Sequence, residues 1–315
     1  MKILVTGGAG YLGSVIVPAL LREGHEVTVI DIFMYNQTPL LECCIDEGLT
    51  VVRGDACDKA LIDQWVKWSD VIVPLACLTG APLCDKEPEV ARKVVVDALQ
   101  LIIDVRDRDQ MIIYPTTNSG YGVGEQGKFC TEETPLRPIS LYGKLKVEAE
   151  DMVLKAGNGI TLRLATAFGV SPRPRLDLLV NDFTYQAVFN GHIELFESHF
   201  KRNYIHLRDV AKAVMHMMAN FDKLKGEAYN VGLSDANLNK WELCEEIQKQ
   251  LPDFTFDENH DGKDPDQRDY IVSNEKIEAT GFIPDVSLKM GIAELIKAFT
   301  ILEKGRSREV QFSNI

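Results

Sequence analysis

The sequence predicts an α/β protein with a doubly wound parallel sheet and a smaller mixed α/β lobe toward its C-terminus. Short apolar runs of strand length alternate with longer amphipathic segments through about the first 165 residues. That regularity is lost after about residue 170, where prolines and arginines become frequent. A chain of 315 residues with 45% hydrophobic content is long and apolar enough to bury the core of such a fold.

Six short apolar runs predict buried strands, at 2–6, 26–30, 49–52, 70–76, 110–115 and 159–165. Apolar residues recur at helical spacing between them, which predicts helices at 11–24, 59–68, 87–107 and 140–156. This alternation is typical of a parallel sheet with helices on both faces. After the loop "VSPRPRLD" we expect a helix at 176–190, another strand–helix unit in "NYIHLRDVAKAVMHMMANF", the strand "AYNVG" and two amphipathic helices.

The composition narrows the class of protein. The net charge of −13 disfavours a broad nucleic-acid-binding face. The seven cysteines have no regular spacing, which is typical of reduced thiols rather than of disulfides or a zinc site, and no motif predicts a metal. The apolar run at the N-terminus is too short for a secretory signal, and no stretch has the length and apolarity of a membrane span. We therefore expect a cytoplasmic protein without membrane contact.

The strongest local signal is "ILVTGGAGYLGSVIVPALLREGHEVTVID". Gly8, Gly10 and Gly13 match G-x-G-x-x-G, and Gly7, Gly10 and Gly13 match the wider G-x-x-G-x-x-G spacing. Such glycines permit a tight turn and close backbone approach to a pyrophosphate, which the N-terminus of the following helix also attracts. A Gly-rich turn without a ligand is the alternative, but the strand before it and the helix after it favour a dinucleotide site.

Two acidic residues end the following strands. Asp31 closes the second strand, where a carboxylate accepts hydrogen bonds from a ribose 2′-hydroxyl and repels a 2′-phosphate, so NAD is favoured over NADP. Asp55 closes the third strand and is a candidate for contact with the adenine edge. Capping of the next helix by Asp55 explains its position equally well.

Tyr142 and Lys146 lie four residues apart in "LYGKLKVEAE" and therefore share a face of the predicted helix. A phenol with a pKa of about 10 is a poor base near neutral pH. A nearby ammonium group and a cationic nicotinamide favour the phenolate, which then takes a proton from a substrate hydroxyl.

Together these residues make the chain resemble the extended short-chain dehydrogenase/reductase family, in its branch of NAD-dependent nucleotide-sugar epimerases, dehydratases and dehydrogenases. The motifs "TGGAGYLG", "GDACD", "TNSGYG", "YGKLK", "YIHLRDVAKA" and "YNVG" occur in family order over nearly the whole chain. The resemblance implies a Rossmann-type doubly wound sheet with a mixed α/β substrate lobe. It places the NAD-binding domain at 1–170 plus 204–232 and the nucleotide-sugar-binding lobe at 171–203 plus 233–315.

The resemblance also implies a catalytic set of Thr117, Tyr142 and Lys146. The family carries a Ser or Thr four residues before the Tyr of its "YG" turn and about 25 before the catalytic Tyr, and both counts fall on Thr117. This hydroxyl is expected to bond the reacting oxygen, with Tyr142 as acid/base and Lys146 holding the nicotinamide ribose. The neighbouring Thr116 and Ser119 are expected to be structural, as strand-end and turn hydroxyls.

The two residues after Thr117 narrow the reaction. In the family's 4,6-dehydratases these two positions are Asp and Glu, the acid and base that eliminate water, whereas this chain has Asn118 and Ser119. An amide and a hydroxyl cannot replace that pair, so dehydration is disfavoured. Oxidation or reduction at one carbon, with or without epimerisation, remains.

The ligand contacts that the resemblance implies fall into two groups. Cofactor contacts are expected from Gly7, Gly10, Tyr11, Leu12, Gly13, Asp31, Asp55, Ala56, Leu75, Ala76, Tyr142 and Lys146. Substrate contacts are expected from Thr79, Asn118, Ser119, Arg173, Arg175, Asn181, Arg202 and Arg268, whose guanidinium groups suit a diphosphate, with surface salt bridges as the alternative. Pro74, Val95 and Thr166 depart from the family's usual His, Asn and Asn.

The loops "PTTNSGYGVGE", "PRPRLDLLVNDFTYQA" and "DPDQRDYIVSN" look most like bacterial enzymes that modify GDP-activated heptoses for surface polysaccharides. We therefore expect an NAD-dependent enzyme that oxidises C4 of a nucleotide-linked sugar, similar to GDP-D-glycero-α-D-manno-heptose 4-dehydrogenases. An epimerase that retains NADH is the alternative, and a non-catalytic dinucleotide sensor is disfavoured by the Tyr/Lys pair. The resemblance implies a homodimer through the helices at 87–107 and 140–156.

Overall fold

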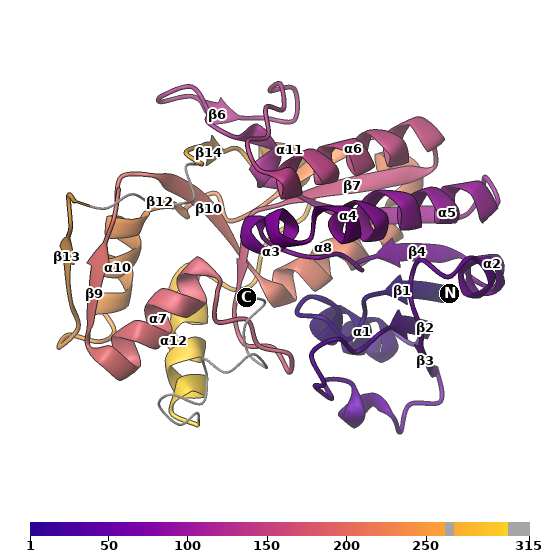
Figure 1. Cartoon of the computed structure of the whole chain (residues 1–315), viewed down its shortest axis with the longest axis horizontal. Coiled ribbons are helices and arrows are strands. Elements are labelled where there is room, and N and C mark those ends of the chain that lie inside the picture. The colour runs from indigo at the N-terminus through magenta and orange to yellow at the C-terminus, as the bar shows by residue number, and fades with distance from the viewer. Residues whose placement is uncertain (262–267, 302–315) are drawn as a thin grey trace.

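The computed structural model describes residues 1–261 and 268–301. Within them, a seven-stranded parallel sheet forms the larger part of the molecule (Figure 1). Its strand order is β11-β7-β5-β4-β1-β2-β3. The strands are β1 (Lys2–Thr6), β2 (Glu26–Asp31), β3 (Leu49–Arg53), β4 (Val71–Pro74), β5 (Met111–Thr117), β7 (Gly159–Leu164) and β11 (Ala228–Val231).

Helices cover both faces of this sheet, and a separate hydrophobic core lies under each layer. One layer contains α1 (Gly13–Arg22) and α8 (Leu207–Ala219), which pack against each other. The other contains α2 (Lys59–Trp68), α3 (Ala81–Lys86), α4 (Pro88–Arg92), α5 (Ala98–Val105) and α6 (Leu141–Ala156). The predicted α/β fold and the six predicted strands are confirmed.

The structure refines two of the predicted elements. The helix expected at 87–107 consists of α4 and α5 joined by a π-helical turn at Lys93–Asp97, a local widening that is often found near functional sites. Strand β5 extends to Thr117, two residues beyond the predicted end. The candidate catalytic hydroxyl therefore lies at the carboxyl end of a central strand, immediately before the 3₁₀ turn Asn118–Tyr121.

Strand order reverses between β1 and β4, because the chain runs outward to β2 and β3 before it returns to β4. In open α/β sheets, ligands bind outside the carboxyl ends of the strands at such a switch point. The glycine-rich loop after β1 and the loop that begins at Leu75 after β4 both start at this place. The topology thus brings two sequence-distant loops to one ligand-binding edge.

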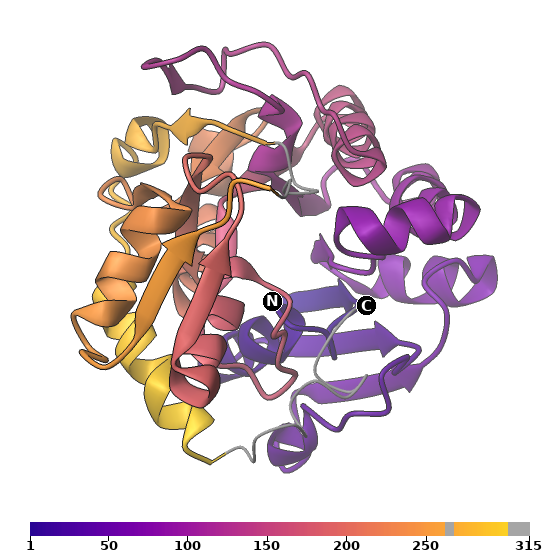
Figure 2. The same ribbon diagram turned by 60° about the vertical axis from the view of Figure 1, so that its left-hand side comes forward.

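A smaller lobe lies beside the sheet, at the left of Figure 1, and Figure 2 shows its orange and yellow elements facing the indigo and purple strands. It contains a three-stranded sheet, β12 (Asn237–Asn239), β10 (Lys201–His206) and β8 (Thr166–Phe168), and the pair β13 (Thr255–Glu258) and β9 (His192–Leu195). Its helices are α7 (Leu179–Asn190), α10 (Lys240–Gln248) and α12 (Leu288–Phe299). The remaining short elements are η1 (Leu41–Cys43), β6 (Phe129–Cys130), α9 (Phe221–Leu224), β14 (Ile271–Val272) and α11 (Glu275–Glu278).

Buried hydrogen bonds join the lobe to the glycine-rich loop. The Tyr11 hydroxyl donates to the Gly169 carbonyl at 2.9 Å and accepts from the Asn181 amide at 2.9 Å. The hydroxyls of Ser14 and Ser171 lie 2.7 Å apart. These contacts fix the segment that follows β8 against the start of α1, so the two halves of the ligand-binding edge have a defined spacing.

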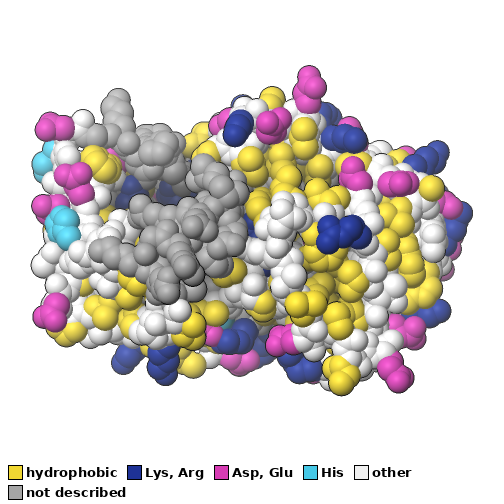
Figure 3. Space-filling view, turned by 60° about the horizontal axis from the view of Figure 1, so that its bottom comes forward, with side chains coloured by type: hydrophobic (Ala, Val, Ile, Leu, Met, Phe, Trp, Pro, Cys, Tyr) yellow, Lys and Arg dark blue, Asp and Glu magenta, His cyan; other side chains and the backbone are white. Residues whose placement is uncertain are grey.

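The surface carries charges of both signs. On the face in Figure 3, basic and acidic side chains are interspersed around the outline, and hydrophobic side chains gather on the right-hand half. Among residues 1–261 and 268–301, no helix combines the length and apolarity needed to cross a bilayer. Over the same residues, no three His, Cys, Asp or Glu side chains are grouped closely enough to hold a metal ion.

Candidate active site

A cavity of about 460 Å³ lies where the carboxyl ends of the central strands face the smaller lobe. Its wall combines the glycine-rich loop, the ends of β2, β4, β5 and β7, the N-terminal part of α6 and residues of the lobe. The cavity therefore occupies the position that the topological switch point predicts.

Glycine is required at two positions of the loop after β1. Gly7 has φ +71°, and a Cβ atom there would lie 2.6 Å from the backbone nitrogen of Ala76. A Cβ atom on Gly13 would lie 2.5 Å from the Cα atom of Gly8. The loop thus packs directly on the segment after β4, and α1 begins beside the cavity without a side-chain cap. Uncapped N–H groups at a helix N-terminus are suited to binding a pyrophosphate.

Asp31 lies at the end of β2 and lines the cavity. One carboxylate oxygen accepts from the backbone of Ala9 at 2.9 Å and the other from the backbone of Phe33 at 2.7 Å. These bonds hold the carboxylate at the cavity wall, and each oxygen has further acceptor capacity for a ribose hydroxyl.

Asp55 and Ala56 also line the cavity, below the end of β3. The Asp55 carboxylate accepts from the backbone of Cys57 at 2.9 Å. The N-cap of α2 is Asp58, which accepts from the first-turn N–H groups at 2.9 and 3.2 Å. The alternative that Asp55 caps this helix is therefore wrong, while contact between Asp55 and an adenine ring stays a prediction.

Tyr142 and Lys146 project from α6 to the cavity. The Lys146 ammonium donates to the Tyr114 hydroxyl at 3.2 Å and to the Pro115 carbonyl at 3.1 Å. Burial raises the pKa of Tyr142 to about 12, and the positive charge of Lys146 acts against this rise. Burial alone would lower the pKa of Lys146, but Cys77 and the two tyrosines outweigh burial and raise this pKa, so the lysine remains an ammonium.

The hydroxyl of Thr117 lies at the same cavity. It accepts from the backbone of Ser119 at 3.1 Å and donates to the Ser119 hydroxyl at 3.0 Å. Arg268 also donates to the Ser119 hydroxyl, so Ser119 and Arg268 join the cavity wall next to Thr117. The three predicted catalytic side chains and the predicted substrate residue Arg268 therefore line one cavity.

Three further predicted substrate residues, Thr79, Arg173 and Arg175, line the cavity. Arg175 donates to the Thr79 hydroxyl at 3.1 Å and forms a buried ion pair with Asp177. Arg173 stacks over the ring of Tyr35, with its guanidinium carbon 3.8 Å from the ring centroid. Arg173 is 2% exposed, so this arginine is a buried part of the wall rather than a surface ion pair.

The structure does not bring three predicted substrate residues to the cavity wall. Asn181 is buried, and its side chain accepts from the backbone of Gly169 and donates to the Tyr11 hydroxyl and the Arg175 carbonyl, so it joins the lobe to the glycine-rich loop. Arg202 donates to the carbonyls of Lys201 and Arg268. Arg268 lines the cavity, whereas Arg202 does not. Asn118 is 1% exposed and is not part of the cavity lining. Substrate contacts by these residues stay predictions.

The departures from the family pattern have structural explanations. Val95 is 2% exposed and belongs to the hydrophobic core beneath α6, where an apolar side chain packs well. Pro74 ends β4, and Thr166 begins β8 and lines the cavity. Thr166 therefore presents a hydroxyl where the family's amide is expected.

Several residues of the wall carry no signal in the sequence. Tyr35 and Gln37 lie in the loop after β2, where no motif or spacing marks them. Tyr270 reaches the wall from just before β14, far along the chain from the glycine-rich loop. Only the folded structure places these side chains beside the predicted set.

Comparison with known proteins supports the same family. A model of the NAD dependent epimerase/dehydratase family matches residues 3–232. A dTDP-glucose 4,6-dehydratase from Streptomyces niveus is 27% identical, over 94% of this chain and 92% of its own length. A UDP-glucose 4-epimerase from Corynebacterium glutamicum is 27% identical, over 78% of this chain and 80% of its own.

Solved structures agree in fold. The UDP-glucuronic acid 4-epimerase of Bacillus cereus superimposes with a TM-score of 0.84 at 20% identity, covering 96% of this chain and 100% of that one. The UDP-glucose 4-epimerase of Thermus thermophilus superimposes with a TM-score of 0.80 at 23% identity, covering 95% and 99%. Because the family model spans most of the sequence, the chain belongs to the NAD dependent epimerase/dehydratase family.

Proposed function

We propose that the protein is an NAD-dependent enzyme that oxidises C4 of a nucleotide-linked sugar, with a GDP-heptose as the sugar. One observation carries the proposal: Thr117, Tyr142 and Lys146 line the same cavity as the glycine-rich loop and Asp31. NAD is the cofactor of the family to which the chain belongs. Three features of this edge fit a dinucleotide: glycine positions without room for a Cβ atom, the start of α1 without a side-chain cap, and the carboxylate at the end of β2.

Each of the cavity residues has a separate role in the proposed reaction. Bound NAD supplies the hydride acceptor. Tyr142 takes the proton of the sugar hydroxyl, and the Lys146 ammonium favours the phenolate by its charge. Thr117 is assigned to hydrogen-bond the reacting oxygen, and Arg175 and Arg268 to bind the diphosphate side of the substrate; their presence in the cavity wall supports these roles.

Dehydration is disfavoured because Asn118 and Ser119 replace the acid and base of the 4,6-dehydratases. The Ser119 hydroxyl is bonded to Thr117 and Arg268, an arrangement that offers no carboxylate for elimination. An epimerase that keeps the reduced cofactor is the second candidate, since the reduced nicotinamide would supply the hydride to the opposite face of the ketone and Tyr142 would return the proton to its oxygen. The relatives with epimerase names support this reading as well as the first.

The choice of GDP-heptose is supported only by the loop resemblance, while the named relatives act on dTDP- and UDP-sugars. The purified enzyme with NAD is incubated separately with GDP-D-glycero-α-D-manno-heptose, UDP-glucose and dTDP-glucose, and the products are analysed by NMR. We expect a 4-keto sugar from the GDP-heptose. A C4 epimer as the sole product would select the epimerase, and no turnover of any GDP-sugar would overturn the substrate assignment.

A further inference from the structure

We propose that the buried ion pair between Glu150 and Arg163 positions the catalytic hydroxyl of Thr117 relative to Tyr142. The inference rests on the proposed function, because it takes Thr117 and Tyr142 as the groups that act on the substrate. Neither Glu150 nor Arg163 lines the cavity. Both are therefore positioning residues, which act through the segment that carries Thr117.

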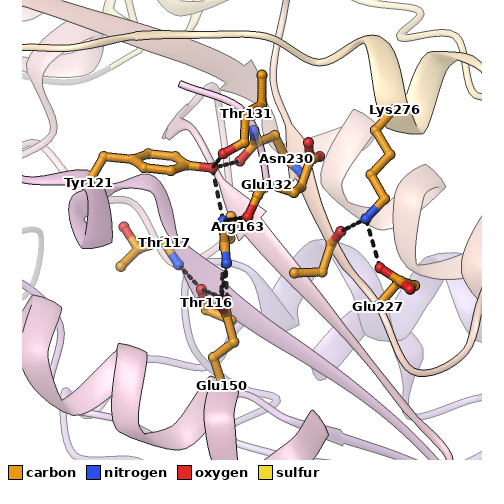
Figure 4. Close-up of polar contacts among 11 residues, drawn as sticks. Thr116, Thr117, Tyr121, Thr131, Glu132, Glu150, Arg163, Glu227, Asn230 and Lys276 are labelled. Atoms are coloured by element: carbon orange, nitrogen blue, oxygen red, sulfur yellow. Dashed lines mark hydrogen bonds and ion pairs between the residues drawn. The ribbon is translucent and has the colours of Figure 1, made fainter. Parts of the chain in front are cut away.

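The ion pair is buried and has several hydrogen bonds (Figure 4). The exposed fraction of the side chain is 7% for Arg163 and 5% for Glu150. The guanidinium donates to the carboxylate through Nη2 at 2.7 Å and through Nε at 3.1 Å to each oxygen. A planar, multiply bonded pair of this kind fixes both direction and distance, so it joins β7 rigidly to α6.

The same ion pair holds both ends of the segment from Thr116 to Tyr121. At one end, the Thr116 hydroxyl donates to a Glu150 carboxylate oxygen at 3.2 Å and accepts from the backbone N–H of Thr117 at 2.5 Å. At the other end, Nη1 of Arg163 donates to the Tyr121 hydroxyl at 3.0 Å. Thr117 lies between these two attachments, and Figure 4 shows both of them converging on the pair.

The far end of the segment has additional support. The Tyr121 hydroxyl lies 2.7 Å from the Asn230 side-chain oxygen and 3.0 Å from the Thr131 carbonyl. Arg163 also donates to the Glu132 carbonyl at 3.1 Å, and the Glu132 carboxylate accepts from the backbone of Asn230 at 2.7 Å. Strands β7 and β11 and the loop before α6 thereby share one polar network.

The acidic partner of the pair lies on the helix of the proposed acid/base. Tyr142, Lys146 and Glu150 are spaced four residues apart on α6 and therefore lie on one face. Any shift of Glu150 relative to Thr116 is also a shift of Tyr142 relative to Thr117. Catalysis depends steeply on such spacing, because misplacement of a reacting group by about 1 Å can cost about 100-fold in rate.

The test removes the two hydrogen bonds of the Thr116 hydroxyl without changing the shape of the side chain. Thr116→Val deletes the hydroxyl that joins Glu150 to Thr117, and Thr116→Ser restores it. With the nucleotide sugar that is turned over fastest among GDP-D-glycero-α-D-manno-heptose, UDP-glucose and dTDP-glucose, we expect kcat of Thr116→Val to fall about ten-fold. Thr116 also lines the cavity, so KM and NAD affinity are measured beside kcat. A positioning role predicts that kcat changes far more than either of them, that the pH profile stays unchanged, and that Thr116→Ser recovers most of the rate.

Thr161→Val is the matched control, because Thr161 is a buried threonine on the neighbouring strand β7 whose hydroxyl has no hydrogen-bond partner within residues 1–261 and 268–301. Its kcat should equal that of the wild type. Tyr121→Phe removes the hydroxyl that accepts from Arg163 at the other end of the segment, and it should also change kcat more than KM. Wild-type kcat in both Thr116→Val and Tyr121→Phe, with Thr117→Val inactive, would overturn the positioning role alone. Full activity of Thr117→Val would overturn both this inference and the proposed role of Thr117.

Discussion

Glu150→Gln tests how far the fold depends on the buried ion pair. The substitution keeps the size of the side chain but removes its charge and replaces one acceptor oxygen with an NH2 group, which cannot accept from Arg163. The Arg163 guanidinium is then left 7% exposed without a carboxylate partner. An uncompensated buried charge is expensive, because the guanidinium has lost its hydration and gains no Coulombic return.

The size of the effect follows from this burial. Removing one partner of a buried ion pair costs about 3–5 kcal/mol of the free energy of unfolding. That is a large share of the roughly 5–15 kcal/mol that stabilises an ordinary domain. With about 2–4 °C lost per kcal/mol in proteins above about 150 residues, we expect the melting temperature to fall by roughly 6 °C or more.

Glu148→Gln provides a matched control on the same helix. Glu148 also forms a bidentate pair with an arginine, at 2.7 and 2.9 Å to Arg92, but the two side chains are 42% and 53% exposed. Exposed pairs contribute about 0–1 kcal/mol, so this variant should unfold close to the wild type. Urea and thermal unfolding, followed by tryptophan fluorescence, measure both variants. A Glu150→Gln variant as stable as Glu148→Gln would refute the reasoning.

Three other predictions concern the cofactor edge. Asp31→Ser should weaken NAD binding about ten-fold and improve NADP binding, measured by calorimetry, and an unchanged preference would contradict the assignment. Gly7→Ala should abolish NAD binding, because its Cβ atom would lie 2.6 Å from the Ala76 nitrogen at φ +71°, whereas wild-type affinity would show that the loop is not so constrained. Lys146→Met removes the charge that lowers the pKa of Tyr142, so the pH of half-maximal oxidation should move upward; a downward shift would count against the phenolate.

Much of the fold was predictable because its signals are local. Buried parallel strands appear as short apolar runs, and β1, β2, β3, β5 and β7 lie where such runs occur. The π-helical turn at Lys93–Asp97 is not predictable, because its residues KVVVD fit an α-helix equally well. The pairing of β10 with β8 and β12 depends on long-range packing that no local pattern records.

The candidate site likewise contains residues that local motifs predict and residues that only long-range packing brings to it. The glycine-rich loop and the Tyr142/Lys146 spacing were visible because each is a short motif that carries its own chemistry. The motif around Arg202 predicts a substrate contact, yet its guanidinium donates to backbone carbonyls in the fold. The sequence predicts only a strand-end hydroxyl at Thr116, because its bond to Glu150 depends on the packing of α6 against β5. Contacts between elements distant in sequence are the part that motifs miss.

The central claim is that Tyr142 removes the proton as hydride reaches the cofactor. Tyr142→Phe keeps the ring that packs against the cavity wall and removes only the hydroxyl. The most direct measurement is a single turnover of enzyme-bound NAD with GDP-D-glycero-α-D-manno-heptose, followed by the absorbance of the reduced nicotinamide, together with the affinity for NAD.

We predict that Tyr142→Phe binds NAD as the wild type does and forms reduced cofactor at least about 100-fold more slowly, as expected when a general base is lost. Formation of reduced cofactor at the wild-type rate in this variant would contradict the account.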